Sequence, residues 1–324
     1  MTARILDLDP ATYIRHAVHA ENRIWPETNC YSDLWMELLH ALGREPVAAL
    51  GFTVAIDFEG DQWTFFKVPS EILADLYGIE VHELAIWRPL AQQLEEQLAR
   101  GRPCLAEVDS FFLPDTAGTS YRRHHVKTTV AVMAIDLAER RLGYFHNAGY
   151  YELRGDDFDD VVRTREPQSS TMLPPYVEFA RIGAPGPAGQ ALRARSRDWL
   201  RRTLTRLPSE NPFIAFRARL ARDAPGLLGT NDLEALHAYS FATFRQFGAC
   251  YELAATYLEW LESDGYPAVN ELTLPFRDLA LAAKVFQFHF ARAVTRGKPL
   301  DLGVVDRMAE HWQHGIAGLT ACYR

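Results

Sequence analysis

The stretch PETNCYSDLWMELLHALG, Pro26–Gly43, predicts a helix together with its N-terminal cap. Its single cysteine, Cys30, stands where that helix should begin. Asn29 or Ser32 can cap the first turn, and Gly43 suits the position after a helix end. Leucines recur between these caps at helical spacing, at Leu34, Leu38, Leu39 and Leu42. A helix N-terminus carries about half a positive charge and unpaired N–H groups, which favour thiolate over thiol. Cys30 is therefore a candidate nucleophile, with a structural cysteine as the alternative.

The composition is that of a soluble globular protein. The chain has 324 residues, of which 48% are hydrophobic and 23% charged, enough for one large domain or two ordinary ones. A net charge of -8 argues against a dedicated nucleic-acid binder. No apolar run approaches the roughly 20 residues of a membrane span, and the first residues lack the apolar core of a secretory signal. We expect a cytoplasmic protein that binds neither nucleic acid nor membrane.

The cysteines are too scattered for a metal site or a disulfide framework. They lie at Cys30, Cys104, Cys250 and Cys322, with no CxxC pair. No HxxxH or HExxH spacing occurs either, so we expect no bound metal. In a reducing compartment all four should be free thiols.

The first half of the chain alternates between helix and strand signals. Helical spacing marks 70–77 and 89–100, and two β-rich runs, 52–58 and 63–68, predict a hairpin. CLAEVDSFFLP, TTVAVMAID and LGYFHNA each predict a strand, the last two joined by the charged turn LAERR. The acidic stretch RGDDFDDVV, 154–162, is interpreted as a solvated loop.

A change of pattern near residue 183 predicts two domains. GAPGPAGQ, 183–190, concentrates glycine and proline as linkers do. Helical periods then predict helices over 191–207, 211–223, 231–263, 270–296 and 302–322. The expected organisation is an α+β domain over 1–182, a linker over 183–190 and a helical domain over 191–324.

A cysteine nucleophile needs a base, and that base usually needs an orienting amide or carboxylate. His124 and His125 stand just before the strand VKTTVAVMAID, and Asn147 ends the next strand. If the turn between the strands closes a hairpin, their outer ends come together. We therefore expect Cys30, His125 and Asn147 to form a catalytic triad, and we expect His146 to face the other side of its strand.

This order of Cys-led helix, strands, VDSFFLP, histidine and asparagine resembles the papain-like cysteine superfamily. NCYSDLWMELLHALG and EVDSFFLPDTAGTSYRRHH are similar to the N-terminal domain of the butirosin-biosynthesis H acyltransferase. The whole chain also resembles a bacterial family known as domain of unknown function 1839. The first resemblance covers roughly 20–165 and implies a papain-like fold, with Cys30 as nucleophile, His125 as base and Asn147 as the orienting residue.

The chain departs from the superfamily pattern at two positions. Counting back from Ala134–Asp136 places the expected base near Thr128, three residues after His125. The oxyanion-hole glutamine should lie about six residues before Cys30, where this chain has Ile24. The resemblance therefore implies oxyanion stabilisation by the Cys30 backbone N–H, with help from Asn29 or Thr28.

The leading functional hypothesis is an acyltransferase that moves an acyl or aminoacyl group from a carrier-protein thioester to a small amine through acyl-Cys30. The phosphopantetheine arm of the carrier would be the handle of the substrate, and no tightly bound cofactor is expected. We expect Asn29, Asp109, Tyr121 and His124 to line the substrate site, although Asp109 could instead hold the 113–121 loop. The alternatives are a cysteine peptidase or amidase, and a catalytically inactive papain-like protein that binds a carrier or peptide.

A second signal is the arginine-rich segment ALRARSRDWLRRTLTRL, which carries six arginines in an acidic protein. One interpretation is a solvated helix paired to the protein's own acids. The other is a docking surface for an acidic carrier protein, formed by Arg193, Arg197, Arg201 and Arg202.

Overall fold

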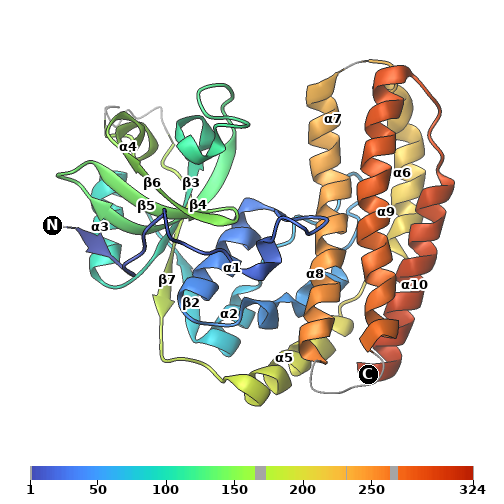
Figure 1. The fold of residues 1–324 in the computed structure, drawn as a ribbon, viewed down its shortest axis with the longest axis horizontal. Coiled ribbons are helices and arrows are strands. Elements are labelled where there is room, and N and C mark those ends of the chain that lie inside the picture. The colour runs from blue at the N-terminus through green and yellow to red at the C-terminus, as the bar shows by residue number, and fades with distance from the viewer. Residues whose placement is uncertain (1, 165–172, 231, 263–268, 324) are drawn as a thin grey trace. The chain divides into compact units, whose positions relative to one another are not determined.

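A computed structural model describes residues 2–164, 173–230, 232–262 and 269–323, and its chain divides into two compact units. The first unit comprises Met1–Ala17, Asn29–Pro46 and Pro69–Gly186. The second comprises Val18–Thr28, Val47–Val68 and Pro187–Arg324. The first unit holds the sheet and the second holds the long helices (Figure 1), which confirms the predicted α+β class.

The sheet of the first unit is antiparallel, and its described strands run in the order β2-β7-β3-β4-β5-β6, with β1 paired to β4 beyond the end of β3. The strands are β1 (Ala3–Arg4), β2 (Ile79–Glu83), β3 (Cys104–Asp109), β4 (Lys127–Asp136), β5 (Arg141–His146), β6 (Gly149–Arg154) and β7 (Val177–Ile182). The helices of this unit are α1 (Cys30–Ala41), α2 (Ser70–Tyr77), α3 (Leu90–Ala99) and α4 (Asp156–Val161). The helices predicted at 70–77 and 89–100 and the strands predicted in TTVAVMAID and LGYFHNA are therefore confirmed. The strand predicted in CLAEVDSFFLP ends earlier, at Asp109, and Ser110–Phe112 forms a short 3-10 helix.

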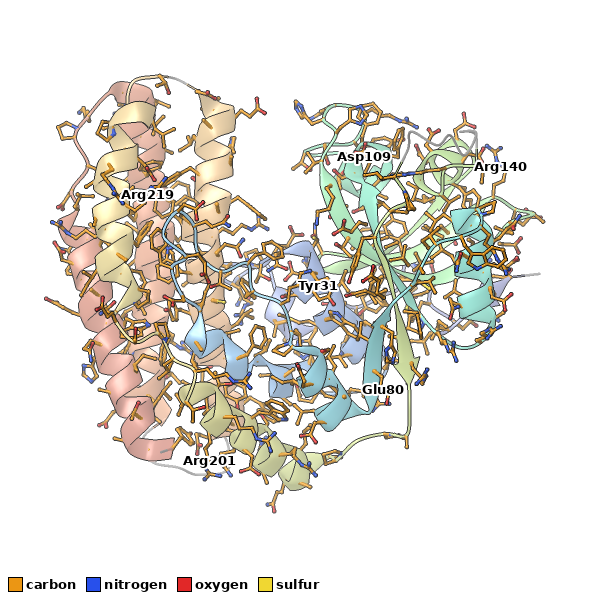
Figure 2. The ribbon with its side chains drawn as sticks, turned by 180° about the vertical axis from the view of Figure 1, so that it is seen from behind. Tyr31, Glu80, Asp109, Arg140, Arg201 and Arg219 are labelled. Atoms are coloured by element: carbon orange, nitrogen blue, oxygen red, sulfur yellow. The ribbon has the colours of Figure 1, made fainter. Side chains whose placement is uncertain are left out.

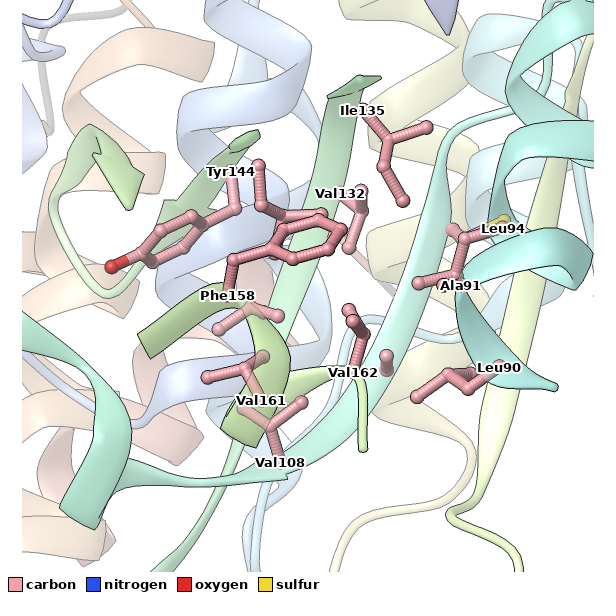
Figure 3. Close-up of a cluster of buried hydrophobic side chains, with 14 of the residues drawn as sticks. Leu90, Ala91, Leu94, Val108, Val132, Ile135, Tyr144, Phe158, Val161 and Val162 are labelled. Carbon is pink, nitrogen blue, oxygen red and sulfur yellow. The ribbon is translucent and has the colours of Figure 1, made fainter. Parts of the chain in front are cut away.

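The central strands alternate between two covered faces. Val130 and Val132 of β4 and Tyr144 of β5 pack with α3 and α4 in one core cluster (Figure 3). The residues between them face the other way, towards α1, which contacts β4, β5 and β6. Tyr13 joins this second face: its ring lies 5.3 Å from that of Phe145, and its hydroxyl donates to Glu37 of α1. Burial on both faces explains why these strands are almost continuously apolar.

The second unit is a helical assembly around an aromatic core. Its helices are α5 (Gly189–Leu204), α6 (Pro212–Leu227), α7 (Leu233–Ser240), α8 (Gln246–Leu261), α9 (Val269–Arg296) and α10 (Gly303–Tyr323). The centroid of the Trp63 ring lies 4.9–5.7 Å from the ring centroids of Phe213, Phe216 and Phe247. The Trp25 indole donates to the Ala280 carbonyl of α9. The division by contacts therefore differs from the predicted division at 182 and 191, because 18–28 and 47–68 pack with these helices.

Two local predictions need correction. The predicted strand over 52–58 is mostly a 3-10 helix, η2 (Pro46–Ala55), and a single bridge joins Phe58 to Trp63. This apolar run is buried among helices, and such a setting does not require the alternation of a half-exposed strand. The acidic stretch contains the short helix α4, whose first turn places its carboxylates at a favourable helix N-terminus.

The helix predicted over 231–263 is interrupted. Residues 231 and 263 lie outside the described residues, and between them a π-helical turn, η5 (Phe241–Arg245), separates α7 from α8. The Gln246 side chain donates to the Phe241 carbonyl in this turn. The turn FATFR contains no proline or glycine that would mark it, so the sequence does not reveal the inserted residue.

Candidate active site around Cys30 and the His125–Asp109 pair

Cys30 is the first residue of α1 and is partly exposed. Asn29 has extended backbone angles, and its side-chain oxygen accepts a 2.9 Å hydrogen bond from the Ser32 N–H. Asn29 is thus the N-cap, as its residue type predicts. The cap leaves the thiol at the positive end of the helix, where a thiolate or a developing oxyanion is stabilised.

The next residue, Tyr31, ties this end of α1 to the edge of the sheet. Its hydroxyl donates to Glu178 of β7 at 2.8 Å, and Tyr176 donates to the other oxygen of the same carboxylate at 2.9 Å. Burial and the nearby Glu178 charge raise the pKa of Tyr31. Burial and the hydrogen bond to Glu178 raise the pKa of Tyr176 to about 12. Both phenols therefore remain protonated donors at neutral pH, and Glu178 remains their acceptor.

Further polar side chains follow β3 on the face that α1 covers. Glu178 pairs in register with Leu105, and alternation puts Glu107 and Asp109 on the same face as Leu105. Lys127, opposite Asp109, donates to Glu107 at 2.8 Å. Figure 2 shows Tyr31 on α1 and Asp109 at the end of β3. This face carries a line of ionisable groups that ends at Asp109.

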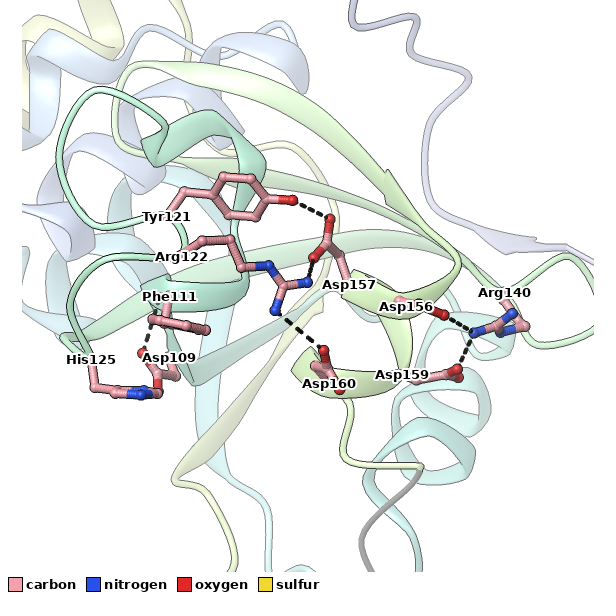
Figure 4. A network of polar contacts seen from close by, with 10 residues as sticks. All are labelled: Asp109, Phe111, Tyr121, Arg122, His125, Arg140, Asp156, Asp157, Asp159 and Asp160. Carbon is pink, nitrogen blue, oxygen red and sulfur yellow. Dashed lines mark hydrogen bonds and ion pairs between the residues drawn. The ribbon is translucent and has the colours of Figure 1, made fainter.

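His125 lies two residues before the start of β4, and its ring contacts the Asp109 carboxylate. The Asp109 carboxylate is 2.6 Å from His125 Nδ1, and the imidazole stacks on Phe111 with a centroid distance of 4.2 Å (Figure 4). The Asp109 carboxylate also accepts from the Phe111 N–H, which fixes the start of the 110–126 loop. The His125 side chain is 68% exposed, so a substrate has access to its Nε2.

Two other residues of this loop contact α4. Tyr121 donates to Asp157 at 2.9 Å, and Arg122 pairs with Asp157 and Asp160 (Figure 4). His124 is exposed, and its backbone N–H donates to Ser120. The Tyr121 hydroxyl predicted to touch substrate is thus engaged within the protein.

Asn147 forms part of the tight turn between β5 and β6. It is the first residue of the two-residue connection between β5 and β6, with φ at 46°, a left-handed conformation in which asparagine is favoured. The β4–β5 register puts Asn147 level with Thr129, four residues from His125. The side chain that the structure brings to His125 is Asp109, a residue that the sequence analysis assigned to substrate binding.

The helix start and the histidine contact different residues of the sheet. The Tyr31 hydroxyl contacts Glu178, which is level with Leu105, and Asp109 lies four residues further along β3. Within the described residues, no hydrogen bond joins Cys30 to His125. The candidate nucleophile and the His125–Asp109 pair thus lie in one unit, without a hydrogen bond between them.

His146, the residue next to Asn147, belongs to a buried network on the opposite face. Its Nε2 is 2.8 Å from Thr128 Oγ1, and its Nδ1 is 2.5 Å from Asp115. Tyr144 donates to the other Asp115 oxygen, and burial together with the Asp115 charge raises the pKa of Tyr144. The residue types match a nucleophile–base–acid series, but His146 is only 2% exposed. The network joins β4, β5 and the 110–126 loop in the interior of the first unit.

The three other cysteines lie in different settings. Cys104 and Cys250 are fully buried. Burial raises the pKa of Cys104 to about 12 and raises that of Cys250 as well. Cys322 is exposed near the end of α10. Among the four thiols, Cys30 alone combines a helix N-terminus with partial exposure.

Two family models together match most of the chain. The DUF1839 N-terminal domain matches residues 14–182, and the DUF1839 C-terminal domain matches residues 189–321. The chain belongs to the DUF1839 family. This confirms the resemblance to family 1839. A search of the curated proteins finds no match.

The arginines of α5 in this DUF1839 chain have partners inside the second unit. Arg193 donates to the Trp260 carbonyl, and Arg197 lies 3.8 Å from the buried Glu262. Arg201 pairs with Asp198, and Arg202 stacks on Trp199. Arg201 and Arg202 are the exposed members of the predicted docking set (Figure 2 labels Arg201).

Two further observations concern metal sites and membrane spans in the described ranges of this DUF1839 chain. They contain no cluster of three or more His, Cys, Asp or Glu side chains arranged to hold a metal ion. None of their helices has the length and apolar character that a membrane crossing requires.

Proposed function

We propose that this DUF1839 chain is a cysteine-dependent acyltransferase, in which Cys30 accepts an acyl or aminoacyl group from a carrier-protein thioester and passes it to a small amine. The observation that carries the proposal is the setting of Cys30, which is capped by Asn29 at the start of α1 and partly exposed. The papain-like resemblance of 20–165 supports the same assignment. The proposed setting is the cytoplasm.

The first half-reaction needs little help beyond the helix terminus. The Cys30 thiolate attacks the thioester carbonyl, and collapse of the tetrahedral intermediate releases the phosphopantetheine thiolate. Because a thiolate attacks and a thiolate leaves, no strong acid is required. The N–H groups of the first turn of α1 lie beside the reacting carbon and stabilise its oxyanion.

The second half-reaction is assigned to the His125–Asp109 pair. The acceptor amine attacks acyl-Cys30, and the Cys30 thiolate leaves as the new amide forms. For Nε2 of His125 to take the amine proton, the imidazole must come within hydrogen-bond reach of that amine, a closer approach to Cys30 than this structure shows. Asp109 fixes the tautomer by its contact with Nδ1 and stabilises the imidazolium. This role for Asp109 replaces the predicted role of Asn147, and the exposure of His125 suits a base that meets an incoming substrate.

The alternatives from the sequence are hydrolysis and an inactive binding protein. A peptidase or amidase would use the same thiol and histidine with water as the acceptor. An inactive papain-like protein would bind the carrier without acylation. Transfer and hydrolysis both pass through acyl-Cys30 and differ only in whether an amine or water attacks it.

The test is intact-mass analysis of the full chain after incubation with a panel of acylated carrier proteins. We expect the mass of one acyl group on wild-type protein and on Cys322→Ala, and none on Cys30→Ala. Release of the acyl group by added amines, faster than by water, identifies a transferase. Release at the same rate by water alone identifies a hydrolase, and absence of any adduct across the panel contradicts the proposal.

A further inference from the structure

The loop 110–126 joins β3 to β4, and the proposed base lies near its end. Its secondary structure consists of two short 3-10 turns, η3 (Ser110–Phe112) and η4 (Pro114–Thr116). Close to β4, the His125 imidazole stacks on the ring of Phe111 (Figure 4). Turns of this length have few hydrogen bonds of their own, so side-chain contacts decide where the loop holds the imidazole.

Asp115 attaches this loop to the interior of the first unit. One oxygen of its carboxylate accepts from the Tyr144 hydroxyl, and the other lies 2.5 Å from Nδ1 of His146. Tyr144 and His146 are two residues apart on β5 and therefore face the same side of the sheet. The side chains of His146 and Asp115 are 3% and 4% exposed. A residue of the loop thus supplies a carboxylate to a buried site.

The buried carboxylate depends on the histidine. A carboxylate only accepts hydrogen bonds, so Nδ1 of His146 carries the hydrogen that Asp115 receives. On the other side of the ring, Nε2 lies 2.8 Å from the Thr128 hydroxyl, which either donates or accepts. Removal of one partner leaves a buried charge uncompensated, which is strongly destabilising. The least costly relief is a shift of the loop that returns Asp115 to solvent.

Ser110 connects this carboxylate to the His125 stack. The Thr116 hydroxyl, one residue after the carboxylate, donates to the Ser110 carbonyl at 2.9 Å. The N–H and the hydroxyl of Ser110 both donate to the Val126 carbonyl, at 2.9 and 3.0 Å. Ser110 is 3% exposed, and the next residue is Phe111, on which the imidazole stacks. A shift of the loop at the carboxylate would therefore reach both sides of the stack.

We infer that Asp115 and His146 are positioning residues for the proposed base, His125. Their buried contact holds the 110–126 loop, and the loop keeps the imidazole stacked on Phe111 beside Asp109. The inference rests on the proposed function for the role of the imidazole, but the position of the imidazole can be measured without any activity. Both residues act on the imidazole through the loop.

A second set of contacts holds the same loop from the surface. Arg122 pairs with Asp157 and Asp160 of α4, and its guanidinium lies 5.6 Å from the centre of the Phe111 ring. The Arg122 side chain is 41% exposed. Exposed ion pairs contribute little to stability, whereas the loss of one partner from a buried pair is costly. The buried contact is therefore the stronger constraint on the loop, and the Arg122 pairs are the rival that the experiment must exclude.

The experiment observes the His125 imidazole by NMR in the full chain with isotope-labelled histidine. Protons that lie over the face of an aromatic ring are shielded, so stacking on Phe111 shifts the His125 signals upfield. The variant His125→Gln identifies these signals by their loss. We expect His146→Leu to lose the upfield shift. His146→Asn should keep most of it, because the asparagine amide places an N–H where Nδ1 lies.

Kinetics on the same variants connect this position to the proposed reaction. Aminolysis of acyl-Cys30 should fall about 10²-fold in His146→Leu, as a small misplacement of a reacting group causes. It should recover in His146→Asn. Formation of acyl-Cys30 should stay as in wild type in both variants, because it depends on the start of α1.

Two further variants separate positioning from stability. Thr128→Val removes the contact at Nε2 and should lower the free energy of unfolding in urea. It leaves the Nδ1 contact in place, so the His125 signals should stay as in wild type. Thr116→Val removes the hydroxyl that bonds to Ser110 and should shift the signals as His146→Leu does. Thr116→Val also replaces His146→Leu in the test if that variant does not fold.

The inference is overturned if wild type shows no upfield shift, or if the shift persists in folded His146→Leu or, where that variant does not fold, in Thr116→Val. Equal loss of the shift in Thr128→Val also overturns it, since lower stability alone then moves the imidazole. Loss of the shift in Arg122→Gln alone assigns the positioning to α4. If wild type never forms acyl-Cys30 while His146→Leu loses the shift, the proposed function is contradicted and the positioning of the imidazole stands.

Discussion

At the scale of single residues, the four cysteines differ through position alone. Cys30 has the helix N–H groups beside it and access to solvent, whereas Cys104 and Cys250 have neither. Cys322 has solvent but lies near the C-terminal end of α10, where the helix dipole disfavours a thiolate. These settings rank the thiols by reactivity without reference to any function.

Alkylation checks this ranking. With limiting iodoacetamide near neutral pH, we expect Cys30 to be modified first, Cys322 more slowly, and Cys104 and Cys250 only after denaturation. Peptide mapping by mass spectrometry gives the order, and Cys322→Ala removes the one competing exposed thiol. Faster labelling of Cys322 than Cys30 in native protein would show that the helix terminus does not activate Cys30.

The His125–Asp109 pair gives a second prediction at this scale. Asp109→Asn keeps the size of the side chain but removes the charge that stabilises the imidazolium, so aminolysis of acyl-Cys30 should fall about 10²–10⁴-fold. Formation of acyl-Cys30 should change little, because it depends on the α1 terminus. Pre-steady-state mass analysis separates the two steps. Asn147→Ala is the control: equal loss there would restore the predicted triad.

The sequence pointed to Cys30 and His125 as candidates, and both roles stay predictions; the contacts of these residues depend on pairing between distant parts of the chain. Cys30 and Asn29 follow from capping rules that act within four residues. The Asp109 contact with His125 depends on the β3–β4 register, and the Tyr31 contact with Glu178 spans 147 residues. No local pattern encodes either contact. A usable signal was present in Glu107, Asp109 and Lys127, charged residues at the ends of two predicted strands that the structure shows to be paired.

At the scale of elements, α1 depends on its cap. The Asn29 side chain accepts from the Ser32 N–H, and Asn29 itself is only 2% exposed. The hydrogen bond from Tyr31 to Glu178 attaches the helix to the sheet. The cap and this tyrosine together therefore set the orientation of the first turn, which carries Cys30.

Replacing the cap gives the third prediction. Asn29→Ala should lower the free energy of unfolding by about 1 kcal/mol, and Asn29→Ser, which retains an acceptor, should lose much less. Urea denaturation measures both. Asn211→Ala is a comparison change: Asn211 caps α6 by accepting from the Phe213 N–H, and it also donates to the Ala309 carbonyl, so its loss should be at least as large. An unaltered urea midpoint for Asn29→Ala, with the loss present at Asn211, would contradict the role of the cap.

The raised pKa values of two tyrosines in the first unit predict that the protein loses stability at alkaline pH. Burial and the neighbouring Glu152 charge raise the pKa of Tyr150 to about 12, and Tyr176 is raised to about 12 as well. In the unfolded chain these phenols ionise near pH 10. Between about pH 10 and 12 the unfolded state therefore binds fewer protons than the folded state, and stability falls as pH rises. Urea midpoints together with tyrosinate absorbance test this; full ionisation of the native protein near pH 10 would contradict it.

At the scale of the whole molecule, the two compact units do not coincide with two continuous stretches of chain. The apolar run at 47–56 and the Trp63 segment pack with α6 and α8, although they are flanked by residues of the sheet unit. Sequence reasoning located the change of pattern at 183–190, since composition and periodicity change there. It could not assign 18–28 and 47–68, because an apolar run does not specify which of two cores will bury it.

This organisation predicts that the C-terminal helices do not fold alone. A fragment of residues 189–324 lacks Trp25 and Trp63, and Trp63 is 1% exposed among Phe213, Phe216 and Phe247. Without it the fragment has a large apolar void, so we expect a molten, dye-binding state or aggregation. In the full chain, Trp63→Ala should cost about 3–5 kcal/mol, whereas removal of the exposed Trp87 side chain should cost little. Near-UV circular dichroism and calorimetry measure both. A fragment that melts cooperatively with native-like aromatic signals would contradict this prediction. It would show that residues 189–324 form a packed core without Trp63, so that the 47–68 segment only packs on the surface of a domain that is already folded.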